Sequence, residues 1–312
     1  MIRVTSKGFD TSERPTDVAH HYVLAGQPVV FDSEVQALSA YHTGTATKRF
    51  SELLANFTEP EFFNVTNSTL AYHGEAPFEN QSRRVRFWRQ KRCAQIDIDG
   101  QPVCQIDFDE GHIHLLDRAS FSDRMCLEIV TGPALMLLLA ELRTYCLHAG
   151  AVASTAGNIA IVAESGVGKS TLSASFNSSW QQISDDVLPV FLSPDEQNKP
   201  LMLADFPQLK LKNAVVSSPP ETTLKLDYLL RVVPQPSNTI RFQKVEKPAA
   251  MLQIIRHTVA TKLFDKTLMK QHTYFAKELS SCVPLLEVRY PRDKQRLPEL
   301  REMIVSEFKA LG

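Results

Sequence analysis

The sequence has almost no net charge and no long apolar run. Its 34 Lys and Arg residues nearly balance its 35 Asp and Glu residues, so the formal net charge is −1 at pH 7. That balance provides no global field to attract nucleic acid or an anionic membrane. The longest apolar run, residues 134–140, is far shorter than the roughly 18 residues of a membrane-spanning helix. We therefore expect neither a nucleic-acid partner nor a membrane partner.

Secretion signals and paired cysteine motifs are also missing. Residues 1–7 lack the apolar core and the cleavage site of a signal peptide, which predicts a cytoplasmic protein. The 5 cysteines are odd in number and scattered, and no two of them have C-x-x-C spacing. We expect reduced thiols, about half of them buried, with no disulfide and no metal.

The composition is that of a globular protein with room for two domains. Of its 312 residues, 43% are apolar and 22% are charged, which is ample for a sizeable core. Alternating apolar residues predict a hairpin over His20–Phe31 and an antiparallel meander over residues 63–116. Apolar residues at helical spacing predict a helix over Thr47–Phe57. We expect residues 1–130 to form an α+β domain that serves substrate docking or regulation.

The remaining residues, 131–312, are expected to form an α/β domain. Two apolar stretches, Leu147–Ala153 and Ile159–Val162, predict a second hairpin. A third predicted strand, Trp180–Val190, is interrupted by two acidic residues. Three helices are predicted further along the chain, beginning near Pro248, Lys266 and Leu297.

A phosphate-binding motif lies between the second of these strands and a predicted helix over residues 172–176. Residues 163–170 match G-x-x-x-x-G-K-[ST] except at the first position, where Ala163 stands in place of Gly. In such a loop successive backbone N–H groups converge on a di- or triphosphate. The side chains of Lys169 and Ser170 would then meet the β and γ phosphates of ATP and a Mg²⁺ ion, respectively. The residues predicted to bind the nucleotide are Ser165, Gly166, Val167, Gly168, Lys169, Ser170 and Thr171.

Two adjacent acids follow the loop closely. Asp185 and Asp186 stand 16 and 17 positions after Lys169 (185 − 169 and 186 − 169). One of them could ligate the metal while the other accepts the proton of an attacking hydroxyl. One or both could instead cap a turn. Because a phosphate loop alone does not separate a kinase from a switch or a motor, the predicted reaction depends on these acids.

These motifs together resemble the catalytic domain of the HPr kinase/phosphorylase family. The resemblance covers residues 132–290 and rests on Leu147-His148-Ala149, the phosphate loop, and Ile183 to Asp186. Looser relatives phosphorylate seryl hydroxyls of peptides, and phosphoenolpyruvate carboxykinase is more distantly related. The resemblance implies an α/β P-loop kinase domain that uses ATP and Mg²⁺.

The resemblance also implies a role for each matched residue. Asp185 would be the general base, Asp186 would ligate Mg²⁺ with Ser170, Lys169 would grip the β and γ phosphates, and His148 would lie beside the transferred phosphoryl group. The sequence departs from the bifunctional enzyme at Thr171, where that enzyme has Glu, and over residues 203–211, where it has a Gly-rich segment. We therefore expect neither HPr as the substrate nor the phosphorylase reaction.

The expected function is transfer of the γ-phosphoryl group of ATP to a hydroxyl. The acceptor is left open between a serine of a peptide or protein and a small hydroxylated metabolite, and homo-oligomer formation is left open as well. Two alternatives are a nucleotide-binding regulator and an ATPase that has no phosphoryl acceptor. Labelling with γ-labelled ATP distinguishes them.

Several cations are candidates for contact with the transferred phosphoryl group. Its charge is spread over three oxygens, which a guanidinium matches well. The candidates in the C-terminal half are Arg241, Lys244, Arg256 and Lys262. Arg241 is favoured because its Pro-rich flanks suggest a lid. The densest basic run, residues 83–92, is expected to be a solvated strand face rather than a nucleic-acid surface.

Overall fold

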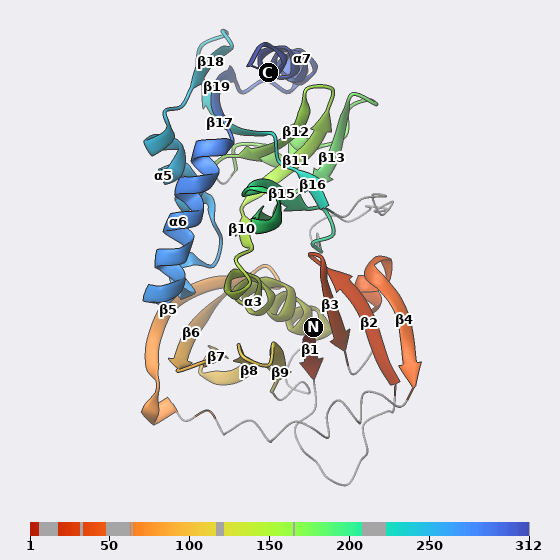
Figure 1. Cartoon of the computed structure of the whole chain (residues 1–312), viewed down its shortest axis with the longest axis vertical. Coiled ribbons are helices and arrows are strands. Elements are labelled where there is room, and N and C mark those ends of the chain that lie inside the picture. Colours follow the sequence, from red (N-terminus) through yellow and green to blue (C-terminus); the bar gives the residue numbers. More distant parts are fainter. Residues whose placement is uncertain are drawn as a thin grey trace. The chain divides into compact units, whose positions relative to one another are not determined.

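The computed structural model describes residues 1–5, 18–31, 34–47, 63, 65–116, 122–164, 166–207 and 223–311. The protein is a mixed α/β protein with several sheets, in which strands predominate (Figure 1). The chain divides into two compact units, Met1–Glu141 with Ala260–Asp265, and Leu142–Val259 with Lys266–Gly312. This division falls after Glu141 rather than after residue 130, and it assigns residues 260–265 to the N-terminal unit.

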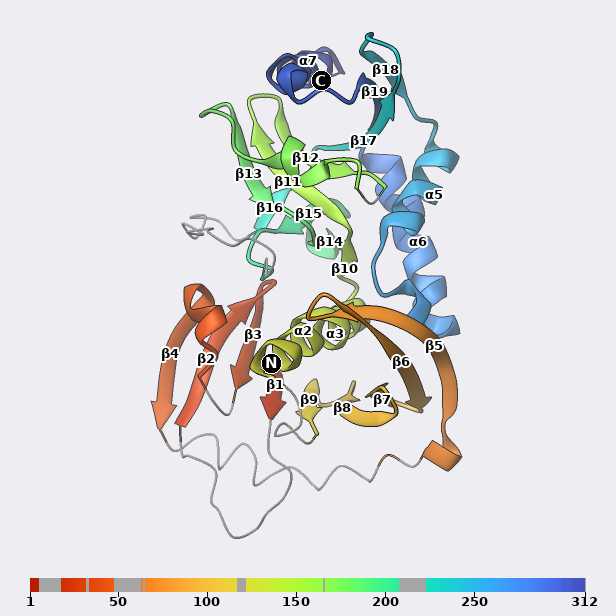
Figure 2. The same cartoon turned by 180° about the vertical axis from the view of Figure 1, so that it is seen from behind.

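The N-terminal unit is built on one sheet, which has nine strands in the described residues, in the order β4-β2-β3-β1-β9-β8-β7-β6-β5 (Figure 2). The strands are β1 Ile2–Thr5, β2 Val18–Leu24, β3 Gln27–Phe31, β4 His42–Thr47, β5 Thr69–Phe78, β6 Gln81–Gln90, β7 Cys93–Ile98, β8 Gln101–Asp107 and β9 His112–Leu115. The predicted hairpin is confirmed in β2 and β3. The predicted meander is confirmed in β5 to β9, which pair antiparallel in chain order. The predicted helix over residues 47–57 lies outside the described residues apart from Thr47, which ends β4.

The helical segments of this unit are short. They are η1 Gln36–Tyr41, η2 Val65–Asn67, α2 Asp123–Ile129, the π-helical turn η4 Val130–Ala134, α3 Leu135–Glu141 and η6 Thr261–Leu263. The side chain of Ser122 caps α2 by accepting a hydrogen bond from the Met125 N–H at 3.1 Å. Most of the α3 residues are buried, as expected for its leucine-rich sequence.

The basic run on β6 is largely neutralised by carboxylates. Arg89, which is 8% exposed, pairs with Glu141 at 3.0 Å and with Asp265 at 3.1 Å. Arg83 pairs with Asp99, Arg86 with Asp97, and Arg92 with Asp109 and Glu141. The expectation of a solvated strand face therefore holds for the outer arginines and is wrong for Arg89, whose buried guanidinium forms part of the packing of the unit.

The C-terminal unit contains two sheets. In the described residues one has six strands in the order β13-β11-β12-β17-β19-β18, and the other has four in the order β10-β14-β15-β16. The strands are β10 Tyr145–Leu147, β11 Ala149–Ser154, β12 Gly157–Val162, β13 Trp180–Ser184, β14 Leu188–Ser193, β15 Lys199–Leu203, β16 Thr223–Lys225, β17 Tyr228–Gln235, β18 Arg241–Lys244 and β19 Leu285–Pro291. The strands β12, β17 and β19 run parallel, so their carboxyl ends lie at one edge of the six-stranded sheet.

The C-terminal unit has six helical segments in its described residues. They are α4 Lys169–Ser173, η5 Pro194–Glu196, α5 Lys247–His257, α6 Lys266–Cys282, η7 Lys294–Arg296 and α7 Leu297–Leu311. From α7, the side chains of Leu300, Ile304 and Phe308 join the alternating apolar residues of β12, β17 and β19 in one core. The three late helices predicted from sequence are confirmed. The helix after the phosphate loop is shorter than predicted, because it ends at Ser173.

No helix within the described ranges is both long enough and apolar enough to cross a membrane. All five cysteines are free thiols, as predicted. Cys104, Cys126 and Cys146 are buried, and burial raises the pKa of the Cys104 and Cys146 thiols well above its usual range. These cysteines act as small apolar side chains rather than as reactive groups.

Candidate active site

The site lies where two neighbouring segments of the chain pass between the four-stranded and the six-stranded sheet. The strand β10 pairs with β14 up to Leu147↔Leu188, whereas β11 pairs with β13 from Ala151↔Ser184 onward. Between these two ladders the pairing is interrupted, and the interruption contains His148 on one chain segment and residues 185–187 on the other. The continuous strand predicted over residues 147–153 is therefore wrong at His148. This break places the histidine opposite the paired acids.

The phosphate loop leaves β12 at the carboxyl end of the parallel strands. Ala163 is 3% exposed and belongs to the core, so the methyl group at the first motif position is accommodated by packing. Gly166 and Gly168 adopt φ values of +77° and +100°, a region that side chains with a Cβ atom rarely enter. Ser165, which was predicted to bind the nucleotide, lies outside the described residues. The loop thus has the backbone turns that its glycines predicted.

A close approach to β11 fixes the short helix α4. A Cβ atom added to Gly150 would lie 2.9 Å from both Cβ and Oγ of Ser173, so only glycine permits this contact. The Ser173 hydroxyl donates to the Ser170 carbonyl at 3.2 Å, and the Gln182 amide donates to Ser173 Oγ at 3.3 Å. These contacts hold the first turn after the loop, which carries Lys169 and Ser170, against the strands beside it.

Three predicted side chains meet at Asp186. Its Oδ1 atom lies 3.1 Å from His148 Nε2 and 3.6 Å from Lys169 Nζ. The side chain of Lys169 is 8% exposed, whereas those of Asp186 and His148 are 24% and 37% exposed. One buried cation, one carboxylate and one imidazole at the edge of the cluster therefore come together directly after the phosphate loop.

Asp185 lies next to this cluster and is 7% exposed. The Gln182 amide donates to its Oδ1 atom at a long 3.5 Å. The Ser184 hydroxyl donates to the Val187 carbonyl at 2.9 Å, which bridges the turn that carries both acids. The turn is thus held by neighbouring groups, and the Ser184 hydroxyl is one of the groups that cap it.

The donors predicted for Mg²⁺ suit that ion chemically. Ser170 offers a hydroxyl and Asp186 a carboxylate, both hard oxygen donors, and Mg²⁺ usually takes one or two protein carboxylates together with waters and substrate phosphates. A cluster of three or more His, Cys, Asp or Glu side chains, as a metal held by protein alone would need, does not occur in the described residues. The two donors, Ser170 and Asp186, therefore suit a metal that takes its other oxygens from water and phosphates.

Of the four candidate cations, the structure brings Arg256 to the loop. Arg256 ends α5, and its guanidinium pairs with Glu164 of the loop at 2.9 Å. Arg241 and Lys244 lie on the edge strand β18, which is separated from β12 by β17 and β19. Lys262 belongs to the N-terminal unit, where its ammonium group lies 6.0 Å from the Tyr72 ring centroid. The preference for Arg241 is therefore not supported by the strand order.

His257 is a neighbour of the site that the sequence did not single out. Its carbonyl accepts a hydrogen bond from the His148 N–H at 2.7 Å, which ties the end of α5 to the catalytic histidine predicted from sequence. Burial, together with the nearby cations Arg256 and Arg231, lowers the pKa of His257 to about 4, although Glu164 opposes the shift. The imidazole is therefore neutral at pH 7 and adds no charge to the site.

A second buried histidine makes the C-terminal unit sensitive to acid. His272 is 0% exposed, its Nε2 lies 2.8 Å from Thr258 Oγ1, and burial lowers its pKa to about 4. Because the unfolded chain takes up this proton below a pKa of about 6.5, stability is lost as the pH falls from 6.5 to 4. A histidine whose pKa falls from 6.5 to about 4 on folding contributes roughly 3 kcal/mol of unfolding free energy at neutral pH.

We expect His272→Gln to reduce the loss of stability between pH 7.5 and pH 4.5, because glutamine can bond Thr258 and does not titrate. The measurement is urea unfolding monitored by Trp180 fluorescence in a Trp88→Phe background. His73→Gln, at an exposed histidine of the N-terminal unit, is the control and should leave the pH dependence unchanged. An identical pH dependence in all three proteins would contradict the assignment to His272.

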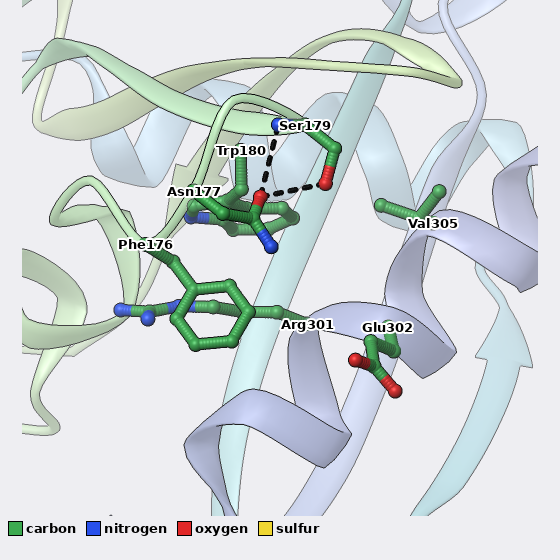
Figure 3. Close-up of a pocket in the computed structure, with 7 residues that line it drawn as sticks. All are labelled: Phe176, Asn177, Ser179, Trp180, Arg301, Glu302 and Val305. Atoms are coloured by element: carbon green, nitrogen blue, oxygen red, sulfur yellow. Dashed lines mark hydrogen bonds between the residues drawn. The ribbon is translucent and has the colours of Figure 1, made fainter.

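A pocket of about 140 Å³ lies beside the carboxyl end of α4 (Figure 3). It is lined by Phe176, Asn177, Ser179, Trp180, Arg301, Glu302 and Val305. None of these residues belongs to the cluster around Asp186. The pocket adjoins the candidate active site through Arg301, which donates hydrogen bonds to two α4 carbonyls.

Comparisons with known proteins include a distant structural neighbour among the matching solved structures. No family model and no curated protein matches the sequence. The solved structure of the HPr(Ser) kinase/phosphatase from Coxiella burnetii matches with 11% identity over 54% of this chain and 99% of that chain, at a TM-score of 0.29. A TM-score this low does not establish a common fold, so the assignment of a function depends on the side chains of the site.

Proposed function

We propose that the protein is a kinase that transfers the γ-phosphoryl group of ATP to a hydroxyl. The observation that carries the proposal is the meeting of His148, Lys169 and Asp186 beside the buried Asp185. A phosphate loop needs only the lysine to hold phosphates. An acid and an imidazole at the same point supply the groups that a proton transfer from an attacking hydroxyl requires.

Each side chain has a distinct part in this proposal. Lys169 neutralises charge on the β and γ phosphates, and the Gly168 and α4 amides add hydrogen-bond donors. Asp185 accepts the proton of the acceptor hydroxyl, and His148 orients Asp186. Asp186 and Ser170 would hold Mg²⁺, which supplies charge neutralisation when it is bound with the nucleotide. Arg256, which lies at the loop through Glu164, is placed to balance charge on the transferred group.

The acceptor is a serine of a peptide or protein or a small hydroxylated metabolite. The N-terminal unit, with its nine-stranded sheet in the described residues, would serve docking or regulation. A regulator that binds ATP without transferring phosphate, or an ATPase without an acceptor, remains the alternative. The second acid, Asp185, favours a reaction over binding alone, because Mg-ATP binding would use Asp186 as the metal ligand and gives no use for another carboxylate beside the phosphates.

Incubation of the protein with γ-labelled ATP, Mg²⁺ and a cell extract tests the proposal. We expect one labelled species that disappears with Lys169→Ala, because loss of a charged contact should weaken ATP binding by about tenfold or more. Lys199→Ala is the matched control, since this lysine lies on β15 and pairs only with Glu196 in the described contacts. ATP binding without any labelled acceptor would favour the regulator, and release of labelled phosphate alone would favour the ATPase.

A further inference from the structure

Side chains from residues 290–301 donate hydrogen bonds to carbonyl groups of the phosphate loop and α4. Tyr290 at the end of β19 donates its hydroxyl to the Val167 carbonyl at 3.1 Å. Arg292 donates to the Gly166 carbonyl at 2.6 Å. From α7, Arg301 donates to the carbonyls of Leu172 at 3.1 Å and Thr171 at 2.7 Å.

The Tyr290 contact determines which way a loop amide points. In a planar trans peptide the carbonyl of one residue and the N–H of the next point in opposite directions. The bond from Tyr290 to the Val167 carbonyl therefore directs the Gly168 N–H away from the tyrosine. The tyrosine hydroxyl also lies 3.9 Å from the position of a Cβ atom on Gly168, so it contacts the turn itself. Tyr290 thus sets the orientation of an amide that a phosphate would meet.

Arg301 holds the other end of α4. This helix has only five residues, so its last carbonyls lack partners within the helix. Arg301 is 7% exposed and supplies donors to two of them. The Phe176 and Trp180 ring centroids lie 5.1 Å and 6.0 Å from its guanidinium carbon, and Figure 3 shows the side chain between the two rings. The buried guanidinium of Arg301 therefore supplies hydrogen-bond donors that a further turn of the helix would otherwise have provided.

We propose that Tyr290, Arg292 and Arg301 are positioning residues that hold the phosphate loop and α4 in the conformation that binds nucleotide. The effect on nucleotide binding rests on the proposed function, whereas the hydrogen bonds themselves do not. All four bonded carbonyls belong to residues 166–172. The three donor side chains therefore act on phosphate binding through the backbone of the loop and α4, without touching the phosphate. Their loss should weaken ATP binding and loosen the loop even when no nucleotide is present.

Two pairs of variants test the inference. Tyr290→Phe removes the hydroxyl that bonds Val167. Its control, Tyr228→Phe, removes a partly buried hydroxyl that donates to the Phe308 carbonyl at 3.3 Å, far along α7. Arg301→Met removes the α7 cation, and its control Arg296→Met removes an arginine that pairs with Glu299 and with the Asn238 carbonyl. We expect the dissociation constant for Mg-ATP to rise about fivefold for Tyr290→Phe and about tenfold for Arg301→Met, and less than twofold for the controls.

Hydrogen exchange without nucleotide provides a second readout. Backbone amides in peptides that cover residues 166–174 should exchange faster in the Tyr290 and Arg301 variants than in their controls. The comparison is made under conditions in which each variant and its control have the same free energy of unfolding. Equal exchange and equal ATP affinity across all four variants would overturn the inference. If the unaltered protein bound no nucleotide, the proposed function would fail, while the exchange comparison would still decide whether these residues hold the loop. Arg301→Lys, which retains the positive charge and one donor nitrogen, should restore part of the protection.

Discussion

Asp185→Asn is expected to lower the rate of phosphoryl transfer by about 10²- to 10⁴-fold, while ATP affinity stays within about threefold of the original value. A positioned general base contributes a factor of this size, and an amide cannot accept the proton of a hydroxyl. Asparagine has nearly the same shape as aspartate, so the buried position and the Gln182 contact can persist. The measurement is the single-turnover rate with the labelled acceptor, together with equilibrium binding of ATP.

Two comparisons sharpen this test. Asp195→Asn, in the turn η5 between β14 and β15, should leave both quantities unchanged because it lies outside the site. Asp186→Asn should also lower the rate, but with a marked change in the Mg²⁺ concentration that is required, because Asp186 is the proposed ligand. Full transfer activity in Asp185→Asn would remove Asp185 as the base. A loss of ATP binding that equals the loss of rate would point to a structural role instead.

Phe308→Ala is expected to destabilise the C-terminal unit by about 3–5 kcal/mol, the usual cost of truncating a fully buried phenylalanine. Phe308 is 0% exposed, and its ring centroid lies 4.2 Å from that of Tyr228. It joins α7 to the core that contains Ile159 and Ile161 of β12, the strand that leads into the phosphate loop. A loss of this size is a large part of the 5–15 kcal/mol typical of whole domains.

Urea unfolding monitored by Trp180 fluorescence in a Trp88→Phe background measures this effect for the C-terminal unit. The matched control is Leu311→Ala, three residues further along the same helix and 45% exposed, which should cost less than about 0.5 kcal/mol. Similar losses for both substitutions would show that α7 does not pack as the core residues indicate.

Local patterns predicted the strands and the late helices well. Alternation of apolar residues and Gly-containing turns are encoded within a few residues, so the hairpin β2–β3, the meander β5–β9 and the helix α7 could be read directly. The helix after the loop was predicted too long. The Ser173 hydroxyl donates to the Ser170 carbonyl, and Ser175 Oγ accepts from the Gln182 N–H of β13. The chain has left the helix at Ala174, where ψ is 141°.

Which cations lie near the phosphate loop depends on the order of the strands in the sheet, and this order cannot be read from local sequence patterns. Arg241 was favoured over Arg256 because of its Pro-rich flanks, but the strand order puts Arg241 on β18 at the edge of the sheet, away from the loop. Tyr290, Arg292 and Arg301 carry no motif, and their contacts span more than 120 residues. In contrast, the meeting of His148, Lys169 and Asp186 was expected, because their order and spacing in the sequence resemble those of the HPr kinase/phosphorylase family.

The assignment of residues 260–265 to the N-terminal unit limits how the chain can be shortened. The polypeptide passes between the units three times, at Glu141/Leu142, Val259/Ala260 and Asp265/Lys266. Removal of everything before residue 142 would therefore strip Asp265 of its Arg89 partner and leave a short segment without its own fold. That segment begins three residues after His257, whose carbonyl holds His148. A C-terminal unit produced alone would thus keep residues 260–265 without the rest of the unit to which they belong.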